Sequence, residues 1–158
     1  MISAKKQKYR HDPDNGVFGD CYRTALAYLL RVDRDEVPHH VTTMSADEWA
    51  TAVQPKYDVY LSTLGLQELA VPVTDSGLDV ILDWQKTRTK IPTEAMLTGK
   101  SRTGCNHVVV VFDGRIVFDP AIDDSGIIGP CEDGFYWITW LIPAPPEEQK
   151  GRTHDLHP

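Results

Sequence analysis

The chain has 158 residues, of which 41% are hydrophobic and 25% charged, the size and balance of one globular domain. Its net charge of −7 argues against nucleic-acid binding, because that function needs a basic face. The N-terminus lacks the apolar core of a signal peptide, and no apolar run approaches the ~20 residues of a membrane span. Three cysteines are an odd number for a disulfide framework, so we expect a reduced, cytoplasmic protein that does not act on membranes.

The first element that the sequence predicts is a helix from Cys21 to about Arg31. Residues 1–20 before it are expected to form an extended arm and loop, because Asp12–Gly16 is dense in turn formers. The arm also carries a basic cluster that we interpret as solvated, namely Lys5, Lys6, Lys8 and Arg10. The buried face of the helix is indicated by four apolar residues at helical spacing, Ala25, Leu26, Leu29 and Leu30.

Cys21 therefore falls in the first turn of this helix. A thiol there lies near unpaired N–H groups and near the positive end of the helix dipole, and both favour the nucleophilic thiolate. The stretch alone leaves a second interpretation open, in which Cys21 is an inert, buried structural cysteine.

The middle of the chain is expected to add helices and short strands. Ser45–Glu48 has the pattern of a capping box, and the helix it opens should restart or kink at Pro55 and end at Gly65. The other expectations here are a solvated connection at Val32–Pro38, a strand at Leu69–Val73 that Pro72 confines to a sheet edge, a helix at Leu78–Gln85 and a strand at Glu94–Thr98.

The clearest β signal is a hairpin, Asn106–Phe112 and Arg115–Pro120, around Asp113-Gly114. Its first strand is apolar at every position from Val108 to Val111, so both faces should be covered. A last buried strand is predicted at Phe135–Ile142. We therefore expect a single α+β domain over residues 1–142, with N-terminal helices packed on a C-terminal antiparallel sheet, and a flexible polar tail over 143–158.

A nucleophilic thiol needs a base and a group that orients the base, and the two ends of the hairpin supply them. His107 begins one strand and Asp119 ends the other. A two-residue turn would place them on opposite faces, whereas a three-residue loop, Phe112–Gly114, would pair them on one face, and we favour the second register. Each alone has a plain structural interpretation, a satisfied core histidine and a turn residue before a proline.

The site also needs donors for a developing oxyanion. The backbone N–H of Cys21 is available at the helix start, and Gln7 is favoured over Asn15 as the side-chain donor. We name Gln7 and Asp20 as the candidate oxyanion and binding residues. A metal site made by Cys105, His107 and Cys131 is a weaker alternative, because the spacing does not match the closed ligand sets that zinc prefers; we expect no metal and no cofactor.

This order of residues, a Cys on the first helix followed by His and Asp on adjacent strands, resembles the papain-like cysteine peptidases. The stretch His11–Cys21 with Val37-Pro38-His39 looks like small papain-like proteins encoded by bacteriophages, near the C39-like (bacteriocin-processing) peptidases. Asn106–Val109 and Val117–Pro120 match the second half of the pattern. The resemblance covers about residues 7 to 142.

The resemblance implies a papain-like thiol hydrolase that cleaves a peptide, isopeptide or amide bond of a peptide or protein substrate. Its catalytic residues would be Cys21, His107 and Asp119, with Gln7 at the oxyanion hole. Transglutaminases and arylamine acetyltransferases share a similar hairpin and the same triad chemistry, so acyl transfer stays open. A catalytically silent papain-like module that binds a partner is a third possibility.

Overall fold

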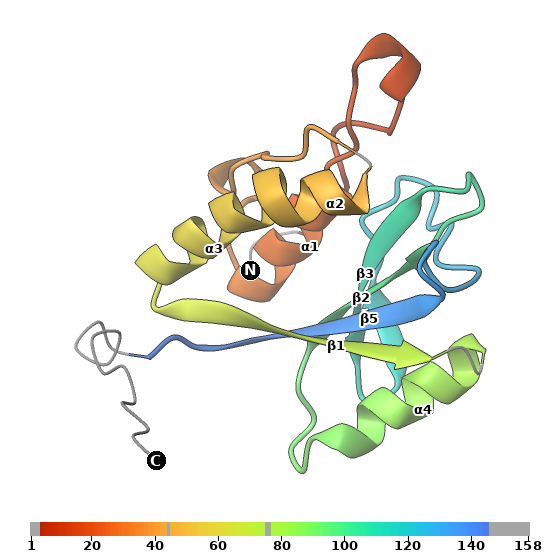
Figure 1. The fold of residues 1–158 in the computed structure, drawn as a ribbon. Helices are drawn as coiled ribbons and strands as arrows, with labels where there is room; N and C mark the ends of the chain where they lie inside the picture. The colour runs from red at the N-terminus through yellow and green to blue at the C-terminus, as the bar shows by residue number, and fades with distance from the viewer. Residues whose placement is uncertain (1–3, 44, 75–76, 146–158) are drawn as a thin grey trace, which may run out of the picture.

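Five antiparallel strands form one sheet with helices on both of its faces (Figure 1). The computed structural model describes residues 4–43, 45–74 and 77–145. The strand order is β1-β5-β2-β3-β4, so β1 and β4 are the sheet edges. The strands are β1 (Leu66–Thr74), β2 (Ala95–Lys100), β3 (Asn106–Phe112), β4 (Arg115–Phe118) and β5 (Phe135–Pro143).

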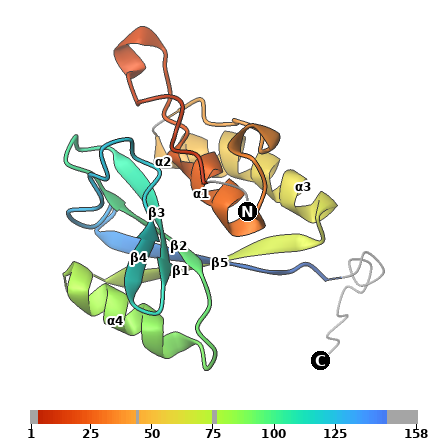
Figure 2. The ribbon, with the colours of Figure 1, turned by 180° about the vertical axis from the view of Figure 1, so that it is seen from behind.

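The helices divide between the two faces of the sheet (Figures 1 and 2). Helix α1 (Cys21–Leu30) lies against β3 and β2, and α3 (Gln54–Thr63) contacts β1. Helix α4 (Leu78–Arg88) covers the opposite face. The remaining helical segments are short: η1 (Pro13–Asn15), η2 (Arg34–Glu36), α2 (Ala46–Glu48) and the π-helical turn η3 (Trp49–Val53).

The core has two parts, one on each face. Val108 and Val110 of β3 belong to the cluster that includes Leu26 of α1, whereas Val109 and Val111 belong to the cluster that includes Ile81 of α4. Because successive residues of a strand point to opposite faces, a continuous apolar run fits a strand covered on both sides. The prediction that both faces of this strand are covered is confirmed.

The expected mixture of helices with an antiparallel sheet is confirmed, and one feature of the layout differs. The helical segments from η1 to α3 precede the sheet and α4 lies between β1 and β2 in the sequence, as predicted, but α4 covers the far face. Helices therefore enclose the sheet instead of packing on one side of it. Edge strand β1 contains Pro72, as expected, and is longer than predicted.

Two other local expectations are refined by hydrogen bonds. The Ser45 hydroxyl accepts the Glu48 N–H, as an N-cap should, but the Glu48 carboxylate accepts from the Thr43 hydroxyl and does not close the predicted capping box. Pro55 lies in the first turn of α3, directly after the π-helical turn, so the helix restarts there. Gly65 follows α3 with a φ of 69°, as a C-terminal glycine does.

The predicted register of the hairpin is wrong. Phe112 pairs with Arg115, so the turn holds only Asp113 and Gly114, both with positive φ. Further along, Val111 pairs with Ile116 but Val110 pairs with Phe118, which leaves Val117 as the extra residue of a β-bulge.

The bulge produces the arrangement that the three-residue loop was expected to give. A two-residue turn alone would put Asp119 on the face opposite to His107. The extra residue reverses the alternation, so that Asp119, one residue beyond Phe118, shares a face with His107. Both residues then point to the same side of the hairpin.

The C-terminal end of β5 passes the end of α3. Strand β5 runs to Pro143, and the Ala144 N–H donates to the Gly65 carbonyl at 2.8 Å. Of the predicted tail over 143–158, residues 146–158 lie outside the described part of the chain. None of the helices that the structure describes has the length and apolar character to cross a membrane.

Candidate active site

Cys21 is the first residue of α1 and is half-buried. The helix begins there because the Asp20 carbonyl accepts both the Thr24 N–H, at 3.1 Å, and the Thr24 hydroxyl, at 2.7 Å. The N–H groups of a first turn have no partner within their own helix. The Cys21 thiol therefore stands beside free backbone donors, as the sequence predicts.

His107 and Asp119 are directly bonded. The Nε2 atom of His107 lies 2.7 Å from Oδ1 of Asp119, and both side chains are buried. The carboxylate fixes the ring so that Nδ1 is the nitrogen left for another partner, and the Cys21 thiol is close enough to His107 to influence its pKa. The structure thus brings together the three residues that the sequence singled out, from α1, β3 and the end of β4.

The surroundings of His107 favour its protonated form. Burial alone would lower the pKa of the imidazole, but hydrogen bonds to Asp119 and Cys21 and the charges of both groups outweigh burial and raise the pKa from 6.5 to about 9. These contacts favour the imidazolium form of His107.

Asp119 is held in its ionised form by three donors. Burial alone would raise the pKa of the carboxyl, but hydrogen bonds from His107 and from the N–H groups of Ala121 and Gly126 lower it below 3.8. The Gly126 N–H reaches Oδ2 at 2.8 Å from the turn that follows. The segment after β4 is thus folded around the carboxylate.

The backbone of Gln7 lies next to Asp119 of the triad. Its N–H donates to the Pro120 carbonyl at 2.8 Å, one residue after Asp119. The long stretch between Gln7 and Cys21 is closed by a loop: the Asp20 N–H returns to the Tyr9 carbonyl at 3.4 Å. The loop itself, which carries η1, projects from the body in both ribbon views (Figures 1 and 2).

Asn15, the other amide considered, is placed in that projecting loop. It is exposed, and its side-chain amide donates to Asp12 at 2.8 Å. It belongs to the internal structure of the loop, so of the two residues Gln7 is the one whose backbone lies next to Asp119.

Asp20 does not fit the role of an oxyanion or substrate contact. Its side chain is fully buried, and its oxygens accept from Lys8 N–H, Tyr9 N–H and the guanidinium of Arg23. A carboxylate is also an acceptor only and cannot donate to an oxyanion. The assignment of Asp20 as a contact residue is therefore corrected.

Sequence reasoning missed two residues near the site, Lys6 and Arg23. The Lys6 ammonium donates to the Asp119 carbonyl at 2.6 Å and pairs with Asp124, so this part of the basic cluster is not simply solvated. Arg23 is buried and pairs with Asp20 at 3.0 Å. An arginine three residues after an aspartate in an apolar helix is the signal that could have revealed the second pair.

The alternative metal site is not formed. Within the residues that the structure describes, no three His, Cys, Asp or Glu side chains gather where they could hold a metal ion. The Nε2 atom of His107 is already bonded to Asp119. Burial is the main cause that raises the pKa of the Cys131 thiol to about 11.

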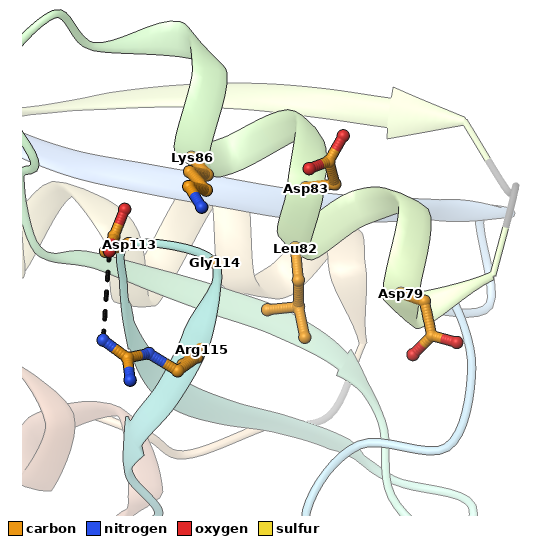
Figure 3. Close-up of a pocket in the computed structure, with 7 residues that line it drawn as sticks. All are labelled: Asp79, Leu82, Asp83, Lys86, Asp113, Gly114 and Arg115. Carbon is orange, nitrogen blue, oxygen red and sulfur yellow. Dashed lines mark ion pairs between the residues drawn. The ribbon is translucent and has the colours of Figure 1, made fainter.

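Two hollows in the surface of the described residues are lined by residues other than the triad. A groove of about 600 Å³ lies between α4 and the hairpin turn, with the carboxylates of Asp79, Asp83 and Asp113 around it (Figure 3). A second, of about 260 Å³, lies behind α1 and is lined by Tyr28, Phe118 and residues of the arm.

Comparison of the chain with protein-family models, with curated proteins and with solved structures found no match.

Proposed function

We propose that this chain is a papain-like thiol hydrolase that cleaves a peptide, isopeptide or other amide bond. The observation that carries the proposal is the contact chain from Cys21 through His107 to Asp119, with 2.7 Å between the last two. A helix that carries the nucleophile and packs on the strand that carries the base is the arrangement that such a fold requires.

The geometry supports an acyl-enzyme mechanism. The Cys21 sulfur attacks the carbonyl carbon after its proton has passed to His107, and the carbonyl oxygen becomes an oxyanion. The Cys21 N–H and the Gln7 side chain would donate to that oxyanion. His107 then gives its proton to the leaving nitrogen, the C–N bond breaks, and a thioester remains on Cys21.

The second half of the reaction repeats these roles with water. His107 takes a proton from a water molecule, the hydroxyl attacks the thioester carbonyl, and the C–S bond breaks. The acid product leaves and the thiolate and imidazolium are restored. Asp119 keeps the ring oriented and stabilises its positive charge throughout, without taking up a proton itself.

The direct test uses p-nitrophenyl acetate, an activated ester that asks for no particular side chain. We expect a burst of p-nitrophenol, acetylation of Cys21 in intact-mass and peptide-mass spectra, and slow release of the acetyl group by water. Absence of Cys21 acetylation, with a folded protein, would contradict the proposal and favour a silent binding module.

A second arm of the test separates hydrolysis from acyl transfer. If the acetyl group leaves Cys21 only when a primary amine such as glycine amide is added, the protein is an acyltransferase of the transglutaminase type. Release at the same rate with and without the amine supports hydrolysis.

A further inference from the structure

The Asp20 carboxylate has two separate sets of partners. Oδ1 accepts two backbone N–H groups of the arm, from Lys8 at 2.9 Å and from Tyr9 at 2.8 Å. Oδ2 accepts from the Arg23 guanidinium, with Nε and Nη2 both at 3.0 Å. One oxygen therefore holds the arm, and the other holds the cation that compensates the buried charge.

This use of an aspartate before a helix is not the usual one. An Asp at this position commonly accepts an N–H of the first helical turn. Here the Asp20 side chain makes no such bond and turns to the arm instead. Burying a carboxylate is costly unless it is fully bonded, so a neutral cap would serve the helix alone at lower cost.

The arm is anchored on both sides of Gln7. Before Gln7, the Lys6 ammonium donates to the Asp119 carbonyl at 2.6 Å. After it, Lys8 and Tyr9 donate to Asp20. Gln7 itself donates its N–H to Pro120. The residue before the nucleophile and the residues at the orienting carboxylate thus hold one short segment, with Gln7 at its centre.

From this arrangement we propose that Asp20 is a positioning residue that acts through Gln7. Its Oδ1 fixes the backbone of the arm at Lys8 and Tyr9, and this sets the Gln7 amide where it can donate to the oxyanion formed at Cys21. The inference rests on the proposed hydrolase function and adds a residue to it. Asp20 touches neither the substrate nor the reacting atoms.

The test compares two reactions of the same thiol. Hydrolysis of p-nitrophenyl acetate passes through an oxyanion, whereas alkylation of Cys21 by iodoacetamide is a displacement at saturated carbon and passes through none. Asp20→Ala should lower ester kcat by about 10- to 100-fold and change the alkylation rate by less than about 3-fold. Gln7→Ala should show the same split.

The two substitutions should not add. If Asp20 acts through Gln7, the double variant Asp20→Ala/Gln7→Ala should be no slower than the slower single variant. Multiplied losses would overturn the proposal, and so would an equal loss of ester hydrolysis and alkylation in Asp20→Ala. Thr24→Val, which removes the hydroxyl bond to the Asp20 carbonyl without touching the arm, is the matched control and should keep the ester rate.

A surface variant covers the case in which Asp20→Ala does not fold. Lys8→Pro removes one N–H donor to Oδ1 and leaves the buried ion pair intact, whereas Lys8→Ala removes the exposed side chain and keeps the N–H. Only Lys8→Pro should lose ester turnover while it keeps alkylation. Equal ester rates in the two variants would overturn the inference even when wild type is active, whereas an inactive wild type would overturn the proposed function itself.

Discussion

The region around the start of α1 and the region around α4 differ in what they bury. Around the start of α1, four charged or titratable side chains are buried in two pairs, Asp20 with Arg23 and His107 with Asp119. On the α4 side, the buried polar side chain that stands out among the described residues is Gln85, a neutral amide.

In the region around α4, the buried amide of Gln85 has a structural role. Gln85 accepts the Gly114 N–H at 3.0 Å and donates to the Thr93 carbonyl at 3.1 Å, which ties the hairpin turn to the end of α4. Buried ion pairs are a poor source of stability, because desolvation offsets much of their attraction. Their concentration at one end of α1, next to a half-buried cysteine, therefore favours a chemical role for that end and a structural role for the other.

The largest effects should follow from breaking the triad. Cys21→Ala and His107→Ala should each lower ester hydrolysis by about 10⁴-fold or more, because each loss stops the same step. Circular dichroism should stay unchanged, since Ala is the best helix former and Cys21 is only half-buried. Kinetics of p-nitrophenol release measure the effect, and a Cys21→Ala protein that keeps the full ester rate would contradict the account.

Asp119→Asn should have a smaller effect on rate and a specific effect on pH dependence. Wild-type turnover should fall as the pH rises through about 9, because the imidazolium that protonates the leaving group is lost there. Without the carboxylate charge the pKa of His107 drops, so this alkaline limb should move to lower pH, with kcat reduced by about 100-fold. The pH dependence of kcat for an amide substrate checks this. An alkaline limb at the same pH in wild type and Asp119→Asn would contradict the role of Asp119 as the residue that orients His107.

The same pair should make stability depend on pH. The pKa of His107 is higher in the folded chain than in the unfolded one, so protonated His107 stabilises the fold below about pH 6.5 and this contribution disappears as the pH rises through about 9. Urea unfolding of wild type and His107→Gln should give free energies that converge above that pH. Free energies of unfolding that differ more above that pH than below it would contradict this prediction.

On the other side of the sheet, Gln85→Leu should leave the chemistry untouched and weaken the fold. It leaves the Gly114 N–H and the Thr93 carbonyl without partners, which costs about 1–3 kcal/mol in the free energy of unfolding. Exposed Lys86→Ala is the neighbouring control and should stay within ~0.5 kcal/mol. Loss of the alkylation rate or of the ester rate in a folded Gln85→Leu protein would contradict the purely structural role of the region around α4.

The smallest effect is expected at the hairpin turn. Gly114 has a φ of 73°, and a Cβ there would lie 3.3 Å from the Leu82 carbonyl, so Gly114→Ala should cost roughly 1–2 kcal/mol. Gly16→Ala, at a φ of 69° with no atom near its Cβ, isolates the cost of the backbone conformation alone. Thermal unfolding should rank Gly114→Ala below Gly16→Ala in stability.

Much of this layout could be predicted from residue patterns. The helix at Cys21, the apolar strand at Val108–Val111 and the hairpin that brings the strand ends carrying His107 and Asp119 together all follow from periodicity and turn signals. The register could not be predicted, because a β-bulge at Val117 has no marker in a run of apolar residues.

The contacts of Asp20 also could not be predicted from the sequence. Its partners include the backbone N–H groups of Lys8 and Tyr9, and these carry no side-chain signature. They meet Asp20 only because the loop between Tyr9 and Gly19 closes on itself. A backbone contact across a closed loop depends on tertiary structure, so no local sequence pattern reveals it.

The most direct test of the central claim is the rate at which iodoacetamide modifies each cysteine at about pH 6.5, followed by peptide mass mapping in wild type and in His107→Ala. Cys21 should react well ahead of Cys105 and of Cys131, whose thiol is buried with its pKa raised to about 11. His107→Ala should slow the reaction of Cys21 by more than about 10-fold. Equal rates at the three cysteines, or a Cys21 rate that does not depend on His107, would contradict the central claim.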